Sequence, residues 1–255
     1  MITFMCKNLI YNSTLTPSTV NAQYPVANVQ NDFRTNVWRS TSNSDNLVID
    51  LGSIESIDSI CVSPNWQNGF GVTAITIEAN ATDSWGSPAF TQTMTLDTDF
   101  GHAIEVFSAT ESYRFWRIVC TSTLGYCELA NIYIGAKTAI TTNGVSYNWS
   151  YTNKDLVSSS KTVYGQEYFD DYGTQKELNS MAFQVMNNTE IEKIFEITDN
   201  CRTIKPFWVK IGDGSNIIIG DEDRLNGIFK LKSQPSFTNF TSGFYNVSLG
   251  LKEQK

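Results

Sequence analysis

The sequence predicts a mainly β protein, with an N-terminal β-sandwich followed by a second β-rich domain that carries one short helix. Three observations lead to this prediction. Short runs in which apolar and polar residues alternate are separated by turns rich in Asn, Asp, Gly and Pro. The 255 residues exceed the roughly 100 to 150 residues of an ordinary domain. The composition, with 41% hydrophobic and 17% charged residues, is typical of a chain that buries a core.

The first domain is expected at residues 1–136, because its strand pattern stops at Gly135. Residues 47–49 form a β-rich run that ends at Asp50-Leu51-Gly52, and residues 72–79 alternate as a half-buried strand does. Turn-forming residues follow this second strand. Further strands are expected at residues 90–96, 102–107, 113–119 and 132–134.

The second domain is expected at residues 137–255, after a polar, Ser/Thr-rich stretch in which the boundary falls between Ala136 and Gly144. Residues 178–186 alternate as a strand. Thr189 and Glu192 have the spacing of a capping box, in which each side chain satisfies a free amide of the other residue. This box predicts a short helix at about residues 190–200, with apolar residues at helical spacing.

The last third of the chain predicts only strands and turns. The Asp213-Gly214 pair stands between the strands expected at residues 207–211 and 217–219, and this is the strongest hairpin signal of the sequence. Two more strands are expected at residues 227–232 and 244–251. The alternation of a strand, one helix and more strands predicts a β-rich domain with little helix.

The charge balance limits the classes of partner. The 18 basic and 26 acidic residues give a net charge of −8, and no Lys/Arg cluster offsets it. Nucleic-acid binding is therefore not expected, since it depends on neutralising phosphates. No window approaches the roughly 18 apolar residues of a membrane-spanning helix, and the opening residues lack the pattern of a secretory signal. We expect no membrane insertion, and synthesis and folding in a cytoplasm.

The five cysteines, Cys6, Cys61, Cys120, Cys127 and Cys201, do not form a CxxC pair. Buried free thiols are expected, with a Cys120–Cys127 bridge as the alternative. With a single histidine in the chain, no zinc site, other metal site or cofactor is expected.

No catalytic residue is expected either, so the chain is not expected to be an enzyme. His102 is the only histidine, no nucleophile motif accompanies it, and we expect it on the surface or in a loop. The acidic clusters Asp97/Asp99, Asp170/Asp171 and Asp221–Asp223 are expected in solvated turns. The segment from Asp221 is not a calcium loop, because Asn226 and Lys232 stand where Gly and Glu are required.

Two blocks of sequence carry a resemblance to a known fold. Residues 24–52 read YPVANVQNDFRTNVWRSTSNSDNLVIDLG, and residues 113–135 read YRFWRIVCTSTLGYCELANIYIG. They resemble the opening and closing strands of the galactose-binding-like jelly rolls, the discoidin and coagulation-factor C-type modules. The resemblance implies a module that binds and does not catalyse.

The calcium site of that family is not expected in this chain. Asn28 and Trp38 keep the family's ten-residue separation. However, two anionic ligands are missing between them, and a hard divalent cation depends on such ligands. The residues that replace the family's Asp, Gly, Asp and Thr are Asn31, Asp32, Phe33 and Asn36.

The family resemblance implies sugar binding by aromatic and polar side chains on loops at one end of the sandwich. An aromatic ring on a polar loop can stack on a pyranose. The candidates are Trp66, Phe70, Trp85 and Tyr126. Tryptophans also fill sandwich cores, and for Trp38, Trp116 and Tyr113 we expect the core. Arg39 is expected to be a paired, half-buried guanidinium that holds a loop.

A second resemblance concerns the whole chain. The opening NLIYNSTLTPST, the later stretch VYGQEYFDDYGTQKELNSMAFQVMNNTEIEKIFEI and the segment KPFWVKIGDGS are similar to tail-tube and baseplate components of bacteriophages, such as distal tail proteins. This similarity implies a structural protein of the virion tail. It also implies a homo-oligomeric ring with other tail or baseplate subunits, in which the jelly roll either docks on a neighbouring subunit or contacts a host surface glycan.

Two other functions remain open. One is a carbohydrate-binding adhesin that acts alone. The other is an esterase or glycosidase built on a jelly roll, which the missing nucleophile motif disfavours.

Overall fold

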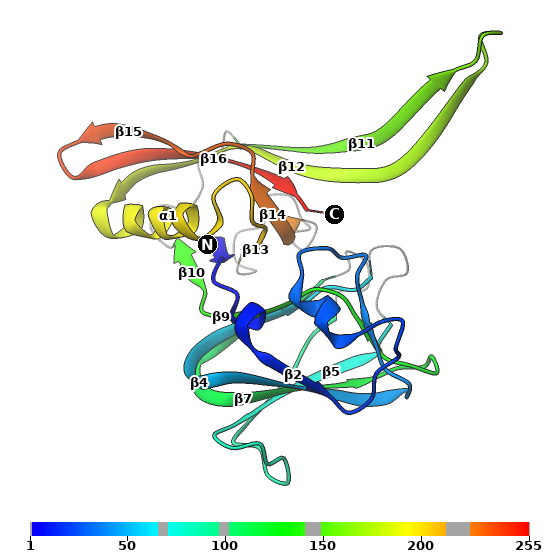
Figure 1. Ribbon diagram of the computed structural model, residues 1–255. Coiled ribbons are helices and arrows are strands. Elements are labelled where there is room, and N and C mark those ends of the chain that lie inside the picture. Colours follow the sequence, from blue (N-terminus) through cyan, green and yellow to red (C-terminus); the bar gives the residue numbers. More distant parts are fainter. Residues whose placement is uncertain (1, 66–70, 97–101, 141–148, 213–224, 255) are drawn as a thin grey trace. The chain divides into compact units, whose positions relative to one another are not determined.

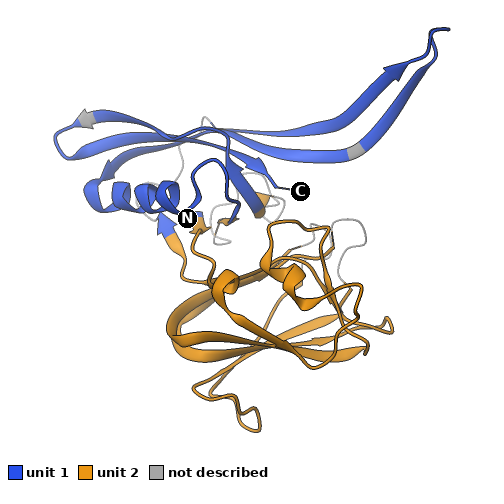
Figure 2. Ribbon diagram, viewed as in Figure 1, with its two compact units in different colours: residues 1–2, 139–207, 228–255 blue, residues 3–138, 208–227 orange. Residues whose placement is uncertain are grey.

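The computed structural model describes residues 2–65, 71–96, 102–140, 149–212 and 225–254 (Figure 1). The chain forms two compact units (Figure 2). Unit 2 comprises Thr3–Thr138 and Trp208–Gly227, and unit 1 comprises Met1–Ile2, Ala139–Phe207 and Ile228–Lys255. The prediction of a mainly β chain with a sandwich in its N-terminal half is confirmed.

Unit 2 is built around two long antiparallel strands, β4 (Ser44–Val62) and β7 (Ala103–Thr121). In its sheet, the strands β2, β4, β7, β5 and β6 are neighbours in that order, and β9 also pairs with β4. The other strands are β2 (Thr14–Pro17), β5 (Ala74–Asn80), β6 (Phe90–Thr93) and β9 (Ile132–Gly135), with the separate pair β3 (Trp38–Arg39) and β8 (Glu128–Leu129); η1 (Leu9–Asn12) and η2 (Val26–Gln30) are 3-10 turns.

Strands β4 and β7 each contribute to both layers of the sandwich. The first part of β4 pairs with β2, and its last part pairs with β9. The change occurs where the β4–β7 register shifts between Asp50 and Glu55. The sequence-based expectations were wrong here in two respects: β4 does not end at Asp50-Leu51-Gly52, and the two strands expected at residues 102–107 and 113–119 are one strand.

A glycine and a carboxylate shape this register shift. Gly52 has φ +79°, and its amide donates to Asp50 Oδ1 at 2.8 Å. Asp50 also accepts hydrogen bonds from Arg114 Nε and Nη2 at 2.7 and 2.8 Å. These bonds and the Arg114 charge lower the pKa of Asp50, although its slight burial opposes the shift. The chain thus bends without leaving the Asp50 carboxylate unpaired.

The core of unit 2 fills the space between the two layers. Trp38 and Trp116 are fully buried, and Tyr113 packs against the same cluster, so the expectation of core positions for all three is confirmed. Trp116 stacks parallel to Phe107, with ring centroids 6.0 Å apart. Burying each such apolar side chain stabilises the fold by about 1.5–3 kcal/mol.

In unit 1 the strands β14, β16, β12 and β11 are neighbours in that order, and β15 pairs with the other part of β16. The division between the units falls inside β1, β10, β13 and β14. The bounds are β1 (Ile2–Met5), β10 (Thr138–Ile140), β11 (Ser150–Lys161), β12 (Glu167–Asn187), β13 (Phe207–Ile211), β14 (Gly227–Leu231), β15 (Ser236–Thr241) and β16 (Phe244–Glu253). The hairpin expected at Asp213-Gly214 lies outside the described residues.

The helix α1 (Asn188–Cys201) confirms the expected helix, but its cap differs from the expected one. Asn187 Oδ1 accepts the Glu190 amide at 3.0 Å, so Asn187 and not Thr189 is the N-cap. Asn187 ends β12 with an extended backbone, which is the conformation that an N-cap requires. The helix buries Ile191, Ile194 and Ile197. It is shorter and more polar than a bilayer-spanning helix, and none of the described residues form one.

The cysteines confirm the expectation of free thiols. Cys6 is half-buried, and Cys61, Cys120, Cys127 and Cys201 are buried; none of the five is in a disulfide. The alternative of a Cys120–Cys127 bridge is therefore not found. Burial raises the pKa of Cys61 and of Cys120 well above the usual value, so these thiols remain protonated.

Gly52→Ala is expected to destabilise the protein by about 1 kcal/mol, because a residue with a side chain is strained at this positive φ. Urea unfolding measures the effect. Gly86→Ala is the control, since an added Cβ meets nothing within 4 Å there and no positive φ is involved. Equal stability of Gly52→Ala and the wild type would show that the bend does not need glycine.

Candidate functional site at one end of unit 2

Three segments meet at one end of the unit 2 sandwich. Ala74, at the start of β5, pairs with Thr121, at the end of β7, so the loops that precede β5 and follow β7 are neighbours. Strand β3 pairs with β8 at Arg39 and Glu128. A Cβ at Gly71 would lie 2.5 Å from Glu128 Cβ, so only glycine allows this approach.

The centre of this end is the guanidinium of Arg39. Its Cζ lies 4.1 Å from the centroid of the Tyr24 ring and 4.3 Å from that of the Tyr126 ring. Nε and Nη2 donate to Glu128 Oε2 at 2.8 and 2.5 Å. A planar cation suits this arrangement, because it stacks on aromatic faces while its edge binds a carboxylate.

The carboxylate of Glu128 is buried and has both oxygens engaged. Its side chain is only 2% exposed, and Asn65 Nδ2 donates to Oε1 at 3.0 Å. Partial burial by itself lowers the pKa of Arg39, but the hydrogen bonds and the charge of Glu128 raise it more, so the net shift is upward. Arg39 is therefore a permanent cation with a 20% exposed side chain.

Arg39 confirms the interpretation of a paired, half-buried guanidinium. Of the four aromatic candidates, Tyr126 lies at this end, half-buried beside Arg39. Trp66 and Phe70 lie outside the described residues. Sequence analysis missed Tyr24, Asn65 and Glu128. Tyr24 and Glu128 stand inside the two resemblance blocks, which is the signal that could have identified them.

Trp85 lies at the opposite end of β5, in the loop after Asn80. The seven residues of β5 span about 20 Å, so the structure does not bring Trp85 and Tyr126 together. Trp85 Nε1 donates to Asp83 Oδ1 at 2.6 Å, and Arg117 Cζ lies 4.5 Å from the ring centroid. One face of this ring is already covered by a cation.

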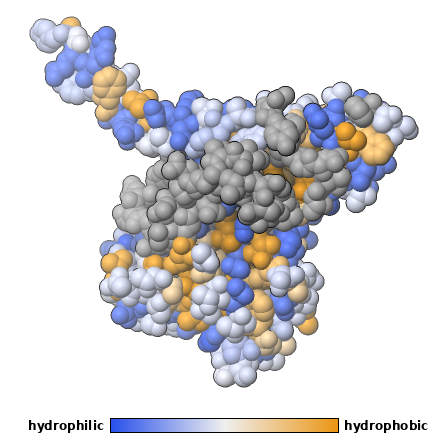
Figure 3. All heavy atoms as spheres, turned by 180° about the vertical axis from the view of Figure 1, so that it is seen from behind, coloured by the Kyte–Doolittle hydropathy of each residue, from blue (hydrophilic) through white to orange (hydrophobic). Residues whose placement is uncertain are grey.

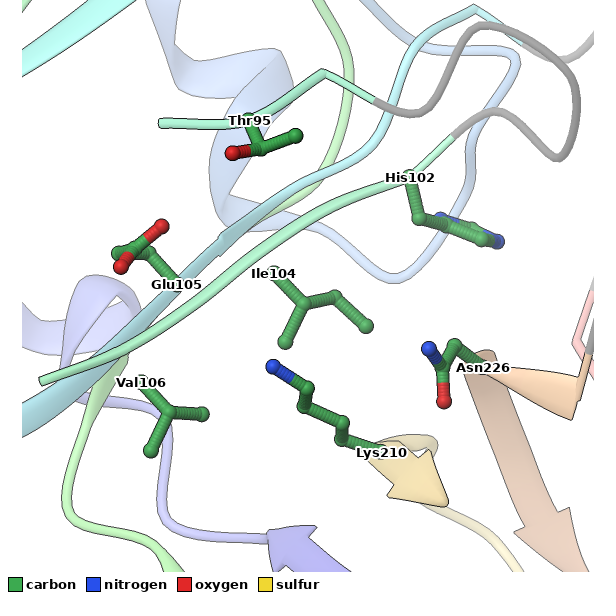
Figure 4. Close-up of a pocket in the computed structure, with 7 residues that line it drawn as sticks. All are labelled: Thr95, His102, Ile104, Glu105, Val106, Lys210 and Asn226. Atoms are coloured by element: carbon green, nitrogen blue, oxygen red, sulfur yellow. The ribbon is translucent and has the colours of Figure 1, made fainter. Parts of the chain in front are cut away.

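Unit 2 also contains a polar cavity of about 340 Å³ (Figure 4). Lys210 and Asn226 point into it from one side, and Ile104 lies opposite them (Figure 4). Asn226 Oδ1 accepts the Ile211 amide at 2.8 Å, which fixes the amide group. Burial raises the pKa of Glu105, against the opposing charge of Lys210. The lining residues are Thr95, His102, Ile104, Glu105, Val106, Lys210 and Asn226.

His102 corrects the sequence-based expectation of a surface or loop histidine. It is only 4% exposed and contacts Trp208 edge to face, with ring centroids 5.2 Å apart. The expectation rested on the position of His102 at the head of an expected strand and on the absence of a nucleophile motif, and neither reveals a long-range aromatic contact. Among the described residues that line the cavity, there is no serine or cysteine that His102 could activate.

The described residues contain no cluster of three or more His, Cys, Asp or Glu side chains that could hold a metal ion. Asn28, at the first position of the family's calcium loop, donates from Nδ2 to the Val37 carbonyl at 2.8 Å. Its amide thus ties the ends of that loop together.

The chain matches no family model and no curated protein. It is similar to several solved structures over about half of its length. One is the family 32 carbohydrate-binding module from C. perfringens NanJ in complex with galactose, at 14% identity over 52% of this chain and 98% of that chain, with a TM-score of 0.44. Another is the lectin domain of lectinolysin complexed with Lewis B antigen, at 9% identity over 51% and 96%, with a TM-score of 0.45. A third is a Streptococcus pneumoniae fucose binding module, at 12% identity over 51% and 98%, with a TM-score of 0.44.

Glu128→Gln is expected to destabilise the protein by about 1–3 kcal/mol, because it removes a buried charged hydrogen-bond partner from Arg39 and Asn65. Urea unfolding measures the loss. Glu167→Gln is the control: it breaks the Lys161–Glu167 pair, whose side chains are 65% and 46% exposed, and should change stability little. A stability loss no larger than that of the control would contradict a central role for Glu128.

Proposed function

We propose that this chain is a structural subunit of a multi-subunit assembly, of the phage tail or baseplate kind, and that unit 1 makes subunit contacts through the β11–β12 hairpin. The sequence resemblance supplies the tail context. The hairpin supplies the physical reason for assembly. The proposed location is the virion tail, after synthesis and assembly in the host cytoplasm.

The observation that carries the proposal is a long two-stranded ribbon without a core of its own. From Thr174 toward the tip of the hairpin, the two strands pair with no other described strand, and residues 157–161 and 163–171 are exposed. At the tip, Val163 is 99% and Tyr164 98% exposed. An isolated two-stranded ribbon is marginally stable in water. Its exposed apolar side chains also lack the stabilisation that burial would give them. A partner subunit that covers this ribbon would remove both costs.

Further apolar side chains follow the ribbon toward the sheet. Val157 is 50% exposed, Tyr168 52% and Phe169 64%. In Figure 3 apolar residues stand among hydrophilic ones on the projecting ribbon. Among the described strands, β11 ends the strand order of its sheet, so its outer backbone edge can pair with another chain. Both features favour β-mediated contacts in a cyclic or stacked assembly.

A second candidate function is glycan binding by unit 2, which the cluster of Tyr24, Arg39 and Tyr126 favours. These three half-exposed side chains are held in one geometry by buried Glu128. Phenolic rings present apolar surface and hydroxyl groups, and a guanidinium donates hydrogen bonds, so together they suit a sugar. Preformed sites lose little entropy on binding. This function is compatible with a subunit of an assembly and also with an adhesin that acts alone.

Val163→Ser/Tyr164→Ser is expected to lower the oligomeric state of the full chain, because it removes the most exposed apolar surface of the ribbon. Light scattering after size-exclusion chromatography measures the mass over a range of concentrations. Ile54→Ser is the matched control, since Ile54 is an exposed apolar residue of unit 2, at 65% exposure. A wild-type chain that remains a monomer, alone and with purified tail subunits, would overturn the assembly proposal.

Tyr126→Ala is expected to weaken glycan binding by about five- to thirtyfold, since one aromatic contact contributes on the order of 1–2 kcal/mol. A glycan array identifies a ligand for the wild-type chain, and calorimetry then compares the variants. Trp85→Phe is the control, because Trp85 lies at the other end of β5. If no glycan binds the wild-type chain, or if Trp85→Phe weakens binding and Tyr126→Ala does not, this site is not the glycan-binding surface.

A further inference from the structure

The outer part of the β11–β12 ribbon and the turn after helix α1 are complementary surfaces. We propose that the acidic ribbon of one copy docks on the basic turn of a second copy. The acidic ribbon comprises residues 157–171, and the basic turn comprises residues 202–205. This inference rests on the proposed assembly function and names the partner and the contact.

The acidic ribbon combines apolar and negative side chains. Tyr168 and Phe169 are exposed and are followed directly by exposed Asp170 and Asp171. In the register, Ser158 lies opposite Asp170 and Val157 opposite Asp171. Residues directly opposite each other share a face, so Val157, Phe169 and Asp171 lie on one face of the ribbon.

The charge of the acidic ribbon is not balanced locally. Lys161 pairs with Glu167 at 2.6 Å, which neutralises both groups. Asp170 and Asp171 form no ion pair with any described residue, and Asp171 Oδ1 accepts only the Gly173 amide, at 2.7 Å. Because Tyr168 and Asp170 lie on the face opposite to Phe169 and Asp171, each face of the outer ribbon presents one carboxylate beside one exposed aromatic ring.

The basic turn has the opposite chemistry. Ile204 is 71% exposed and stands between Arg202 and Lys205, which are also exposed. Neither cation forms an ion pair with a described residue. An apolar side chain flanked by cations fits a ribbon face on which an aromatic ring adjoins a carboxylate.

The basic turn is held in one conformation. The amides of Arg202 and Lys205 donate to the carbonyls of Thr198 and Cys201, each at 2.9 Å. Cys201 is buried and anchors the turn to the end of α1. A docking surface that is already ordered loses little entropy when a partner binds.

The acidic ribbon cannot reach the basic turn of its own chain. Strand β12 continues from Asp171 to Asn187, a distance of roughly 50 Å at about 3.3 Å per residue. Helix α1 then begins, and its 14 residues have a length of about 21 Å. Even if the helix returned directly toward the ribbon, a gap on the order of 30 Å would remain. The partner of the acidic ribbon is therefore in another copy.

A contact between two different surfaces of identical chains is heterologous. Such a contact propagates from copy to copy and gives a closed ring or an open stack. Since the whole chain carries a net charge of −8, the two cations of the basic turn provide local attraction between copies that otherwise repel each other. The contact should weaken as salt rises.

Charge reversal tests the proposal. Asp170→Lys/Asp171→Lys and Arg202→Glu/Lys205→Glu should each weaken self-association by about tenfold or more, because like charges then face each other. The four changes together in one chain should restore it. An equimolar mixture of the two variants should also assemble, since each acidic surface then meets a basic one. Analytical ultracentrifugation at low salt measures all four samples.

Glu192→Lys/Glu196→Lys is the matched control, because it reverses two exposed charges on α1 and changes the net charge as much as the ribbon variant does. It should leave the association unchanged. If Val163→Ser/Tyr164→Ser dissociates the assembly but the charge reversals have no effect, or do not rescue each other, this docking is wrong while the assembly function stands. If the wild-type chain does not self-associate, the docking is overturned as well.

Discussion

The carboxylate of Glu128 holds together three parts of unit 2 that are far apart in sequence. It binds Arg39 from strand β3 and Asn65 from the loop before β5, and its own Cβ lies against Gly71. A buried carboxylate would be costly without these partners, so they are ordered wherever Glu128 is buried. The position of the Tyr24 and Tyr126 rings follows from that of Arg39. The candidate glycan-binding end is thus a consequence of one buried charge and its hydrogen bonds.

Sequence predicted best those elements in which one face is buried. The strands of unit 2 have apolar residues at every second position, and helix α1 has them three or four positions apart. The structure contains these elements. Arg39 was also predictable, because a guanidinium beside a core tryptophan needs a partner. The identity of that partner was not, since Glu128 is 89 residues away and only folding brings it near. The N-cap was misplaced for a local reason, because Asn187 and Thr189 are both good caps and the end of β12 decided between them.

The ribbon shows why the remainder could not be predicted. Strand β11 contains Ser, Thr, Asn and Lys at most positions, and its polar pattern is also that of a linker. Hydrophobic periodicity arises where one face of an element is buried, and the outer ribbon has no buried face among the described residues of its own chain. The same holds for His102, whose burial depends on Trp208 from a distant strand. Residues whose environment comes from far along the chain, or from another chain, leave no local signal.

The two units differ in how far their charged side chains are paired and their aromatic side chains are covered. This difference bears on their roles. At the end of unit 2, the charges of Arg39 and Glu128 are paired with each other, so the surface keeps its geometry without a ligand. In unit 1, the acidic ribbon exposes aromatic rings and carboxylates that other described residues do not pair. Covering that ribbon would bury exposed apolar surface, whereas the charged groups at the end of unit 2 are already paired. The proposed association through unit 1 uses no residue of the Tyr24–Arg39–Tyr126 surface, and an assembly of many copies would multiply any weak affinity of that surface for a glycan.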